Sequence, residues 1–189
     1  MKTYPAIIIL IALSLFSSAQ TDRYSGSYVC MNGMTHFFAS TPIEDIDATS
    51  KVTLCVINTE TKKVYAKVRM TSFDFRRKLM QEHFNEDYVE SEKYPYAILD
   101  ADIVSEIDFT KDGTYDITLK GTFEVHGVKQ DREIKGKLTI KDGQPKSATA
   151  EFDVKLVDHK IKIPKAVIAK IAEVFKVNVD FTFEKYTAK

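Results

Sequence analysis

The feature that most constrains this chain is the strict alternation of apolar and polar residues in several separate segments. Between positions 63 and 70 every second residue is apolar, and lysine, tyrosine, lysine and arginine fill the positions between them. A period of two is typical of a β-strand with one buried face. Dipeptides that favour tight hairpin turns, such as Asp142-Gly143, separate the segments. The sequence therefore predicts antiparallel strands connected mainly by hairpins.

The alternating segments amount to about eight strands, and the fold class is mainly β. We expect two short strands within Tyr24–Ser40, around an Asn32-Gly33 turn, and further strands at residues 51–57, 63–70, 97–103, 115–125, 134–140, 148–156 and 177–183. Pro42 to Thr49 is expected to be a helical or looped connection. Two short helices are expected, one within residues 79–84 and one that begins at Pro164 and carries an apolar stripe ending at Val174 and Phe175.

A sheet of this length must close or fold over on itself. An eight-stranded antiparallel β-barrel has an interior just wide enough for side chains, or for one small ligand. Small residues recur on the expected inward faces, namely Ala66, Ala97, Ala101, Gly121, Gly136, Ala148 and Ala150. Either they leave an apolar cavity, or they accommodate bulky neighbours such as Phe123 and Phe152 in a packed core.

The segment Phe73–Ala101 interrupts the run of strands. Residues 79–84 have the spacing of a short amphipathic helix, and Tyr94-Pro95 returns the chain to an extended conformation. An apolar helix set between strands suggests a lid or floor on the β-structure.

Residues 1–19 have the organisation of a secretory signal peptide, because Lys2 precedes an apolar run that ends in small residues. We expect cleavage after Ala19. A retained membrane anchor is the alternative, but the run is shorter than the roughly 20 apolar residues that span a bilayer. Residues 20–189 are then expected to form a single domain that is not an integral membrane protein after processing.

The chain carries 27 basic and 27 acidic residues, and loss of residues 1–19 removes only Lys2. The resulting formal charge of −1 gives no electrostatic reason to expect nucleic acid or an anionic membrane surface as a partner. Two cysteines, Cys30 and Cys55, could form a disulfide after export or remain free thiols. Cys55 is expected on the opposite face of its strand from Leu54.

No residue pattern indicates catalysis, and we expect no catalytic residue, no cofactor and no metal ion. The four histidines, His36, His83, His126 and His159, form no His-x-His or zinc-type helical pair, and no nucleophile elbow or phosphate loop is present. His126, beside Gly127, is expected to hold a turn. A pair between a carboxylate and His36 or His83 inside the barrel would favour an enzyme instead.

Several motifs resemble those of the YceI family. In the central segment they are FDF at 73–75, LMQEHF at 79–84, Tyr88 and KYP at 93–95. Upstream, FFASTPIEDI at 37–46 resembles the first strand and turn of the family, and downstream GTFEVHGVK at 121–129 and IKIP at 161–164 resemble its second-half motifs. The resemblance covers essentially the whole chain after the signal peptide.

The resemblance implies an extended, lipocalin-like β-barrel in the bacterial periplasm that holds a polyisoprenoid or similar amphiphilic lipid. Dimers occur in the family, so a homodimer is a further expectation. The leading hypothesis is binding, sequestration or transport of an elongated isoprenoid or fatty-acyl lipid without catalysis. The alternatives are an enzyme acting on such a lipid, and a structural or stress-response interaction protein with a packed core.

The expected ligand contacts are the apolar lid residues and the inward-facing residues of the strands. They are Phe38, Leu54, Ala66, Val68, Met70, Phe73, Phe75, Leu79, Met80, Phe84, Leu99, Ala101, Leu119, Gly121, Phe123, Ala150 and Phe152. If the interior is packed, the same lid residues close the barrel end as core. Arg76, Arg77 and Lys78 near the expected mouth could meet a head group, although solvation of these charges is favoured.

Overall fold

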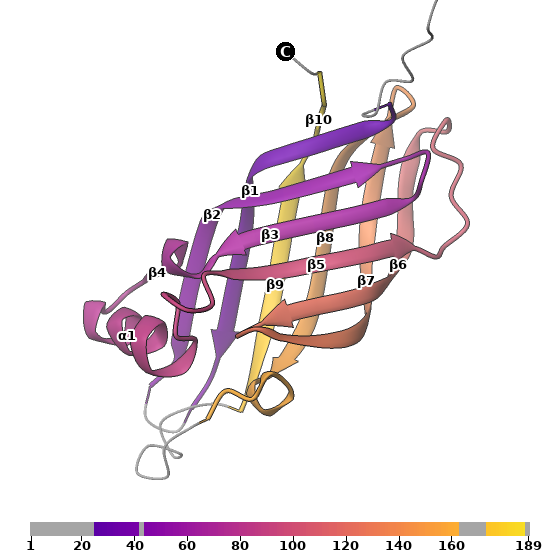
Figure 1. The fold of residues 1–189 in the computed structure, drawn as a ribbon. Helices are drawn as coiled ribbons and strands as arrows, with labels where there is room; N and C mark the ends of the chain where they lie inside the picture. Colours follow the sequence, from indigo (N-terminus) through magenta and orange to yellow (C-terminus); the bar gives the residue numbers. More distant parts are fainter. Residues whose placement is uncertain (1–24, 42–43, 163–172, 188–189) are drawn as a thin grey trace, which may run out of the picture.

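The computed structural model describes residues 25–41, 44–162 and 173–187, which form a closed antiparallel β-barrel (Figure 1). The long strands are β1 (Ser27–Ala39), β2 (Ile46–Asn58), β3 (Lys63–Arg69), β5 (Tyr96–Ile103), β6 (Gly113–Val125), β7 (Val128–Lys141), β8 (Gln144–Lys155) and β9 (Val174–Thr182). They are neighbours in the order β1-β9-β8-β7-β6-β5-β3-β2, and β2 pairs again with β1. The predicted eight-stranded barrel is therefore confirmed.

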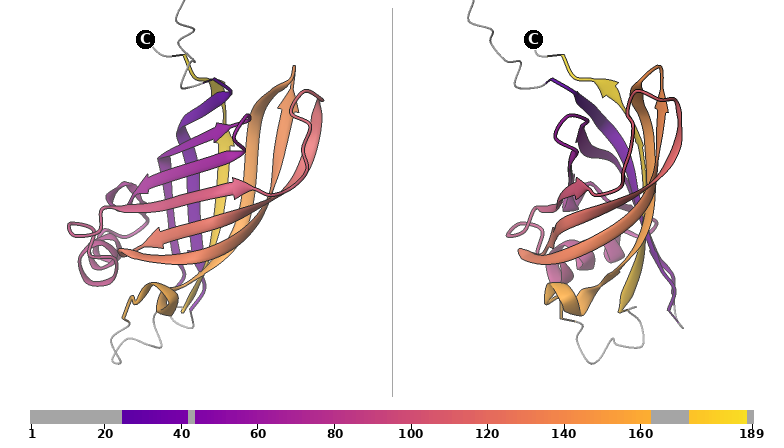
Figure 2. Two further views of the ribbon diagram at one scale, coloured as in Figure 1. Left: turned by 45° about the vertical axis from the view of Figure 1, so that its right-hand side comes forward. Right: turned by 90° about the vertical axis from the view of Figure 1, so that its right-hand side faces the viewer.

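Short elements complete the barrel. Two-residue strands, β4 (Asp74–Phe75) and β10 (Glu184–Lys185), pair with β2 and β1. The helix α1 (Lys78–His83), at the predicted place, continues into a π-helical turn, η2 (Phe84–Tyr88). The 3-10 turns are η1 (Met70–Ser72) and η3 (Leu156–His159). Figures 1 and 2 show α1 at one end of the barrel and the loop 104–112 at the other.

β1 and β2 each contain one extra residue where they pair. Between the paired residues Cys30 and Gly33, β1 advances by three residues and β2 by two; between Gly33 and Thr35, β2 advances by three and β1 by two. A bulge of this kind reverses which alternate positions face the interior. Before the bulge Tyr28 and Cys30 are buried, as is Ser27 at the start of the strand; from Gly33 to Ala39 the buried positions are the odd ones.

These bulges correct the predictions for the first two strands. Tyr24–Ser40 does not form two short strands, because Asn32-Gly33 belongs to a bulge within one long strand and not to a turn. Glycine is required there, since a Cβ on Gly33 would lie 2.3 Å from the ring of Phe181. The predicted connection Pro42–Thr49 is also wrong in part, because β2 already begins at Ile46; residues 42–43 lie outside the described part.

The second predicted helix falls largely outside the described residues, which exclude 163–172. Its expected last residues, Val174 and Phe175, are instead the start of β9, where they pair with Lys155 and Val154 of β8. Leu156, expected as the end of a strand, begins η3. β7 is longer than predicted because a two-residue turn at His126-Gly127, with φ of 53° and 69°, joins it directly to β6.

The barrel interior has two differently built ends. At the closed end, fully buried Leu138 and Ile140 pack with Ile103, and Ile107 and Phe109 of the β5–β6 loop lie against the same cluster. At the gate end, beneath α1 and η2, a second buried cluster is centred on aromatic residues such as Phe37, Phe73 and Phe75.

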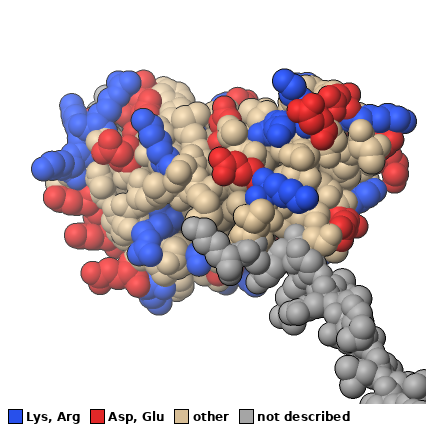
Figure 3. Space-filling model, turned by 90° about the horizontal axis from the view of Figure 1, so that it is seen from above, with Lys and Arg blue, Asp and Glu red and all other residues tan. Residues whose placement is uncertain are grey.

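The outer surface mixes both signs of charge. Lys, Arg, Asp and Glu are interspersed on the face seen from above (Figure 3), and cross-strand ion pairs such as Lys63–Asp102 at 2.8 Å and Lys120–Glu133 at 3.1 Å join neighbouring strands. Among the helices of the described residues, none is long and apolar enough to cross a membrane.

Candidate functional site: an apolar cavity inside the barrel

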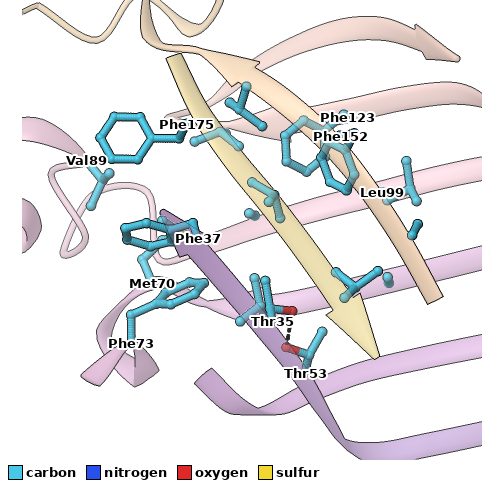
Figure 4. Close-up of a pocket in the computed structure, with 18 of the residues that line it drawn as sticks. Thr35, Phe37, Thr53, Met70, Phe73, Val89, Leu99, Phe123, Phe152 and Phe175 are labelled. Carbon is cyan, nitrogen blue, oxygen red and sulfur yellow. Dashed lines mark hydrogen bonds between the residues drawn. The ribbon is translucent and has the colours of Figure 1, made fainter. Parts of the chain in front are cut away.

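A cavity of about 820 Å³ lies inside the barrel and takes its lining from all eight long strands and from α1 and η2. This volume is in the range of small-molecule sites. Figure 4 shows Phe123, Phe152 and Leu99 on one side of it, and Phe37 and Phe73 on another. Most of the lining is aliphatic or aromatic. The interior is therefore suited to an apolar guest.

The incomplete burial of the inner wall decides between a cavity and a packed core. On β8 the inward residues Ala148, Ala150 and Phe152 are only partly buried, whereas Leu138 of β7, at the closed end, is 0% exposed. All three β8 residues pack against the closed-end cluster and also line the cavity, so part of their apolar surface borders the cavity and is not covered by other side chains. Ala66 and Gly136 line the same space.

Two small residues have a different role. Gly121 of β6 is directly opposite Ala101 of β5, and a Cβ on Gly121 would lie 2.2 Å from the carbonyl oxygen of Asp100 and 2.7 Å from the Ala101 Cβ. Neither residue lines the cavity. Here small size permits a close approach of two strands and adds no volume to the cavity, which corrects the sequence-based interpretation of this pair.

The lid over the gate end is an aromatic cluster. The Phe37 ring of β1 lies 4.8 Å from that of Phe73, 5.7 Å from Phe75, 5.3 Å from Phe84 and 5.6 Å from Phe175 between ring centroids. Edge and tilted contacts at these distances are favourable. Packing between rings therefore helps to hold the lid on the barrel, together with the pairing of β4 with β2 and the Arg77–Glu44 hydrogen bond.

A polar contact holds the end of the lid. Glu90, just after η2, has its Oε2 2.7 Å from His126 Nε2, and His126 Nδ1 lies 3.2 Å from the carbonyl oxygen of His159. Both partner atoms are acceptors, so the imidazolium form of His126 can donate to both at once. The Tyr94 ring packs against His126 with centroids 4.5 Å apart. His126 thus occupies the predicted turn and also ties the lid to η3.

Four charged or titratable side chains of the cavity lining lie at its mouth and form two pairs, while a fifth, Lys67, lies over the Tyr96 ring. Arg77 Nη1 lies 2.9 Å from Glu44 Oε1, and His83 Nδ1 lies 2.6 Å from Asp87 Oδ2. The His83 and Asp87 side chains are 54% and 57% exposed, so water solvates them. Burial and the nearby Asp87 charge raise the pKa of Tyr88, which keeps its phenol neutral.

One polar pair lies deep in the wall. Thr35 and Thr53 are buried, both line the cavity, and their Oγ1 atoms are 2.7 Å apart (Figure 4). Cys55, two residues further along β2, also lines the cavity, and burial raises the pKa of its thiol far above the ordinary value. Cys30 is directly opposite Cys55 across the β1–β2 pair, and both are free thiols.

Most of the expected contact residues lie together around this cavity. Those that line it are Ala66, Val68, Met70, Phe73, Phe75, Leu79, Met80, Phe84, Leu99, Leu119, Phe123, Ala150 and Phe152. Phe38 and Leu54 do not: Phe38 is paired with outward Asp47 and Lys176, and Leu54 with Lys67. The bulges shift the inward positions of β1 and β2 by one residue, so the inward orientation expected for Phe38 and Leu54 is wrong.

The same shift explains which lining residues the sequence missed. Phe37, Thr35, Thr53 and Cys55 point inward because they follow or precede a bulge, and strict alternation along the whole strand would place them outside. A signal was present in Gly33, since glycine within a strand often marks a bulge.

The histidines do not form a metal site with acidic or thiol groups, since no cluster of three such ligands exists among the residues that the structure describes. His36 pairs with Asp47 at 3.2 Å and does not line the cavity. His159 is fully buried and its Nδ1 donates to the carbonyl of Val128 at 3.0 Å; desolvation by burial lowers its pKa.

The chain matches a known family model and resembles several solved structures in fold. A family model described as the YceI-like domain matches residues 30–183. A polyisoprenoid binding domain from Saccharophagus degradans implicated in plant cell wall breakdown superposes with a TM-score of 0.66 at 11% identity, covering 85% of this chain and 99% of that one. BcnA of Burkholderia cenocepacia gives 0.60 at 11% identity over 78% and 94%, and the Campylobacter jejuni YceI protein gives 0.60 at 16% over 79% and 90%. No curated protein matches. At these identities the solved structures establish the fold alone.

Proposed function

Because the chain belongs to the YceI-like domain family, we propose that it binds an elongated amphiphilic lipid of the isoprenoid or fatty-acyl type inside the barrel, and sequesters or carries it without catalysis. The observation that carries the proposal is the 820 Å³ apolar cavity with its incompletely buried wall. The related domain from Saccharophagus degradans is described as polyisoprenoid binding, which supports the same class of ligand.

The energetics of binding suggest that the cavity selects lipids by the length and shape of their hydrocarbon chain. Each methylene group transferred from water into the cavity contributes about 0.8 kcal/mol, so a chain of about fifteen carbons contributes on the order of 12 kcal/mol before the cost of association. Small wall residues such as Ala66 and Ala150 provide width, and the aromatic lid covers the chain. Paired charges at the mouth, Arg77–Glu44 and His83–Asp87, would lie beside the end of the lipid nearest to water.

We place this activity in the periplasm. The proposed signal peptide, residues 1–19, lies outside the described residues, so its support is the sequence pattern alone. N-terminal sequencing of protein recovered from the periplasm tests it. A mature chain that begins at Gln20 agrees with the proposal, and an uncut chain in the membrane fraction contradicts it.

An enzyme acting on the lipid is the weaker alternative. The His36–Asp47 pair is outside the cavity. The His83–Asp87 pair does line the cavity, but at the mouth, where both side chains are more than half exposed. A general base in bulk water lacks the desolvated surroundings that tune its pKa for catalysis.

Solvent extraction of natively purified protein, followed by mass spectrometry, tests lipid binding. The matched control is Ala150→Phe, which narrows the cavity from its wall. We expect an isoprenoid or acyl lipid in the wild-type extract, at about one molecule per chain, and at least a tenfold lower yield from the variant. Equal yields from both proteins, or no lipid from the wild type, would contradict the proposal.

A further inference from the structure

The two bulges of β1 and β2 place a pair of hydroxyl groups between the two apolar ends of the interior. On β1, Thr35 lies between Cys30 of the closed-end cluster and Phe37 of the gate-end cluster. On β2, Thr53 lies between Ala48 of the gate-end cluster and Cys55 of the closed-end cluster. The pair is therefore about midway along the cavity wall, away from the charged mouth.

The hydrogen bonds of this pair are incomplete. Each threonine hydroxyl has one proton to donate and two lone pairs. One hydroxyl donates to the other across 2.7 Å, and the second proton then has no protein acceptor among the described residues. Thr35 is 6% exposed and Thr53 is 3% exposed, so bulk water does not provide a ready acceptor either. A buried donor without an acceptor costs free energy.

A second hydroxyl pair, between buried Ser50 and partly buried Ser72, has the further acceptor that the threonine pair lacks. Ser50 Oγ lies 2.8 Å from Ser72 Oγ, and the Ser72 hydroxyl donates to the carbonyl oxygen of Arg69 at 2.6 Å. Neither serine lines the cavity. The serine pair thus donates its remaining proton to a backbone carbonyl oxygen and needs no ligand, whereas the threonine pair borders the cavity, where a ligand could accept its remaining proton.

We propose that Thr35 and Thr53 form a hydrogen-bonding subsite for an uncharged oxygen acceptor (a carbonyl, ether or hydroxyl group) of the bound lipid. The subsite rests on the proposed lipid-binding function and narrows its ligand class: the lipid carries a neutral polar group into the barrel. A carboxylate or phosphate at this depth would be desolvated without a cation, since the charged lining residues Glu44, Arg77, His83 and Asp87 are at the mouth and Lys67 lies over the Tyr96 ring.

Two saturated C20 isoprenoids that differ by one oxygen test this, the alcohol phytanol and its parent hydrocarbon phytane, titrated from cyclodextrin into the delipidated full chain. We expect wild-type protein to bind phytanol roughly three- to tenfold more tightly than phytane, as one net hydrogen bond allows. In the variant Thr35→Val/Thr53→Val, which keeps the side-chain volumes, that preference is lost while phytane binds as before.

The control variant is Thr114→Val/Thr139→Val, which removes a cross-strand threonine pair of the same kind, 3.1 Å apart, on the exposed surface. It should keep the wild-type preference. Equal affinities in the wild type, or a preference that survives in the Thr35/Thr53 variant, would overturn the subsite and leave lipid binding intact. Failure of both isoprenoids to bind the wild type would overturn the proposed function and the subsite with it.

A measurement on the wild-type protein guards against a variant that does not fold. The infrared carbonyl stretch of bound phytone, the methyl ketone of the same series, should shift to lower frequency than in alkane solvent. A carbonyl band at its alkane-solvent frequency would overturn the proposal, because it would show a carbonyl that accepts no hydrogen bond.

Discussion

The closed end and the gate end of the barrel are built on the same strands but from different side chains. Aliphatic residues such as Leu138 and Ile140 fill the closed end and are at most 1% exposed. Phenylalanine rings fill the gate end, and the lid above them leaves Leu79 63% exposed. Dense aliphatic packing resists change of volume, whereas α1 and η2, which cover the gate end, contain no buried residue and can move at a lower cost in free energy. We infer that the closed end supplies stability and the gate end supplies access.

The largest effect is expected from a truncation at the closed end. Leu138→Ala leaves a cavity where no surface was exposed, so the free energy of unfolding should fall by about 3 kcal/mol, within the 2–5 kcal/mol of such changes. Urea unfolding measures it. The same truncation at the gate, Leu79→Ala, should change stability by less than about 0.5 kcal/mol. Similar losses for both variants would remove the distinction between the two ends.

A truncation at the gate end should have a smaller effect on stability but a clear effect on the rate at which bound lipid dissociates. Phe84→Ala removes ring contacts to Phe37, Phe73 and Phe75, which should lower the free energy of unfolding by about 1–2 kcal/mol. Dissociation of bound phytanol, followed by transfer to acceptor vesicles, should become roughly tenfold faster if about 1.4 kcal/mol of the exit barrier is lost.

The matched control for the gate is Phe109→Ala, since Phe109 packs against the closed end. It should leave the dissociation rate unchanged. An acceleration by Phe109→Ala equal to that by Phe84→Ala would show that the lid is not the exit route.

The smallest expected effect is on the pH dependence of the free energy of unfolding, through His159 of η3. Burial lowers the pKa of His159 in the folded state, so the unfolded chain binds a proton first as pH falls below the ordinary value of 6.5. The native state is therefore destabilised between pH 6.5 and the lower native pKa, and above pH 6.5 this contribution to stability is fully present. His159→Gln can still donate to Val128 but does not titrate. Between pH 7 and 5, the free energy of unfolding of this variant, measured in urea, should fall less than that of the wild type. If the two free energies fall in parallel, His159 does not contribute to the pH dependence of stability.

The sequence carries the strand pattern, the lid helix and most of the cavity wall, because each depends on local alternation and spacing. The sequence does not predict which residues of β1 and β2 face inward. One extra residue in each strand reverses the two faces, and only the pairing of the strands determines where that residue lies. For the same reason alternation alone places Phe38 and Leu54 inside the barrel and gives no indication of the threonine pair. Val174 and Phe175 fit a helical stripe as well as a strand, and pairing with β8 decides for the strand.

The closed-barrel register also decides what the small residues do. Gly121 and Ala150 look alike in an alternating segment, yet the first lies against a neighbouring strand and the second faces the cavity. This difference depends on which strands approach each other most closely, a property of the whole barrel.

The central claim is that a lipid chain occupies the space between the two ends. A crystal structure of the natively purified protein tests it most directly. We expect continuous electron density for a chain that runs from the lid past Phe37 and Phe152, with a polar atom within hydrogen-bond distance of Thr35 or Thr53. A cavity filled by collapsed side chains or by ordered water alone would contradict the account.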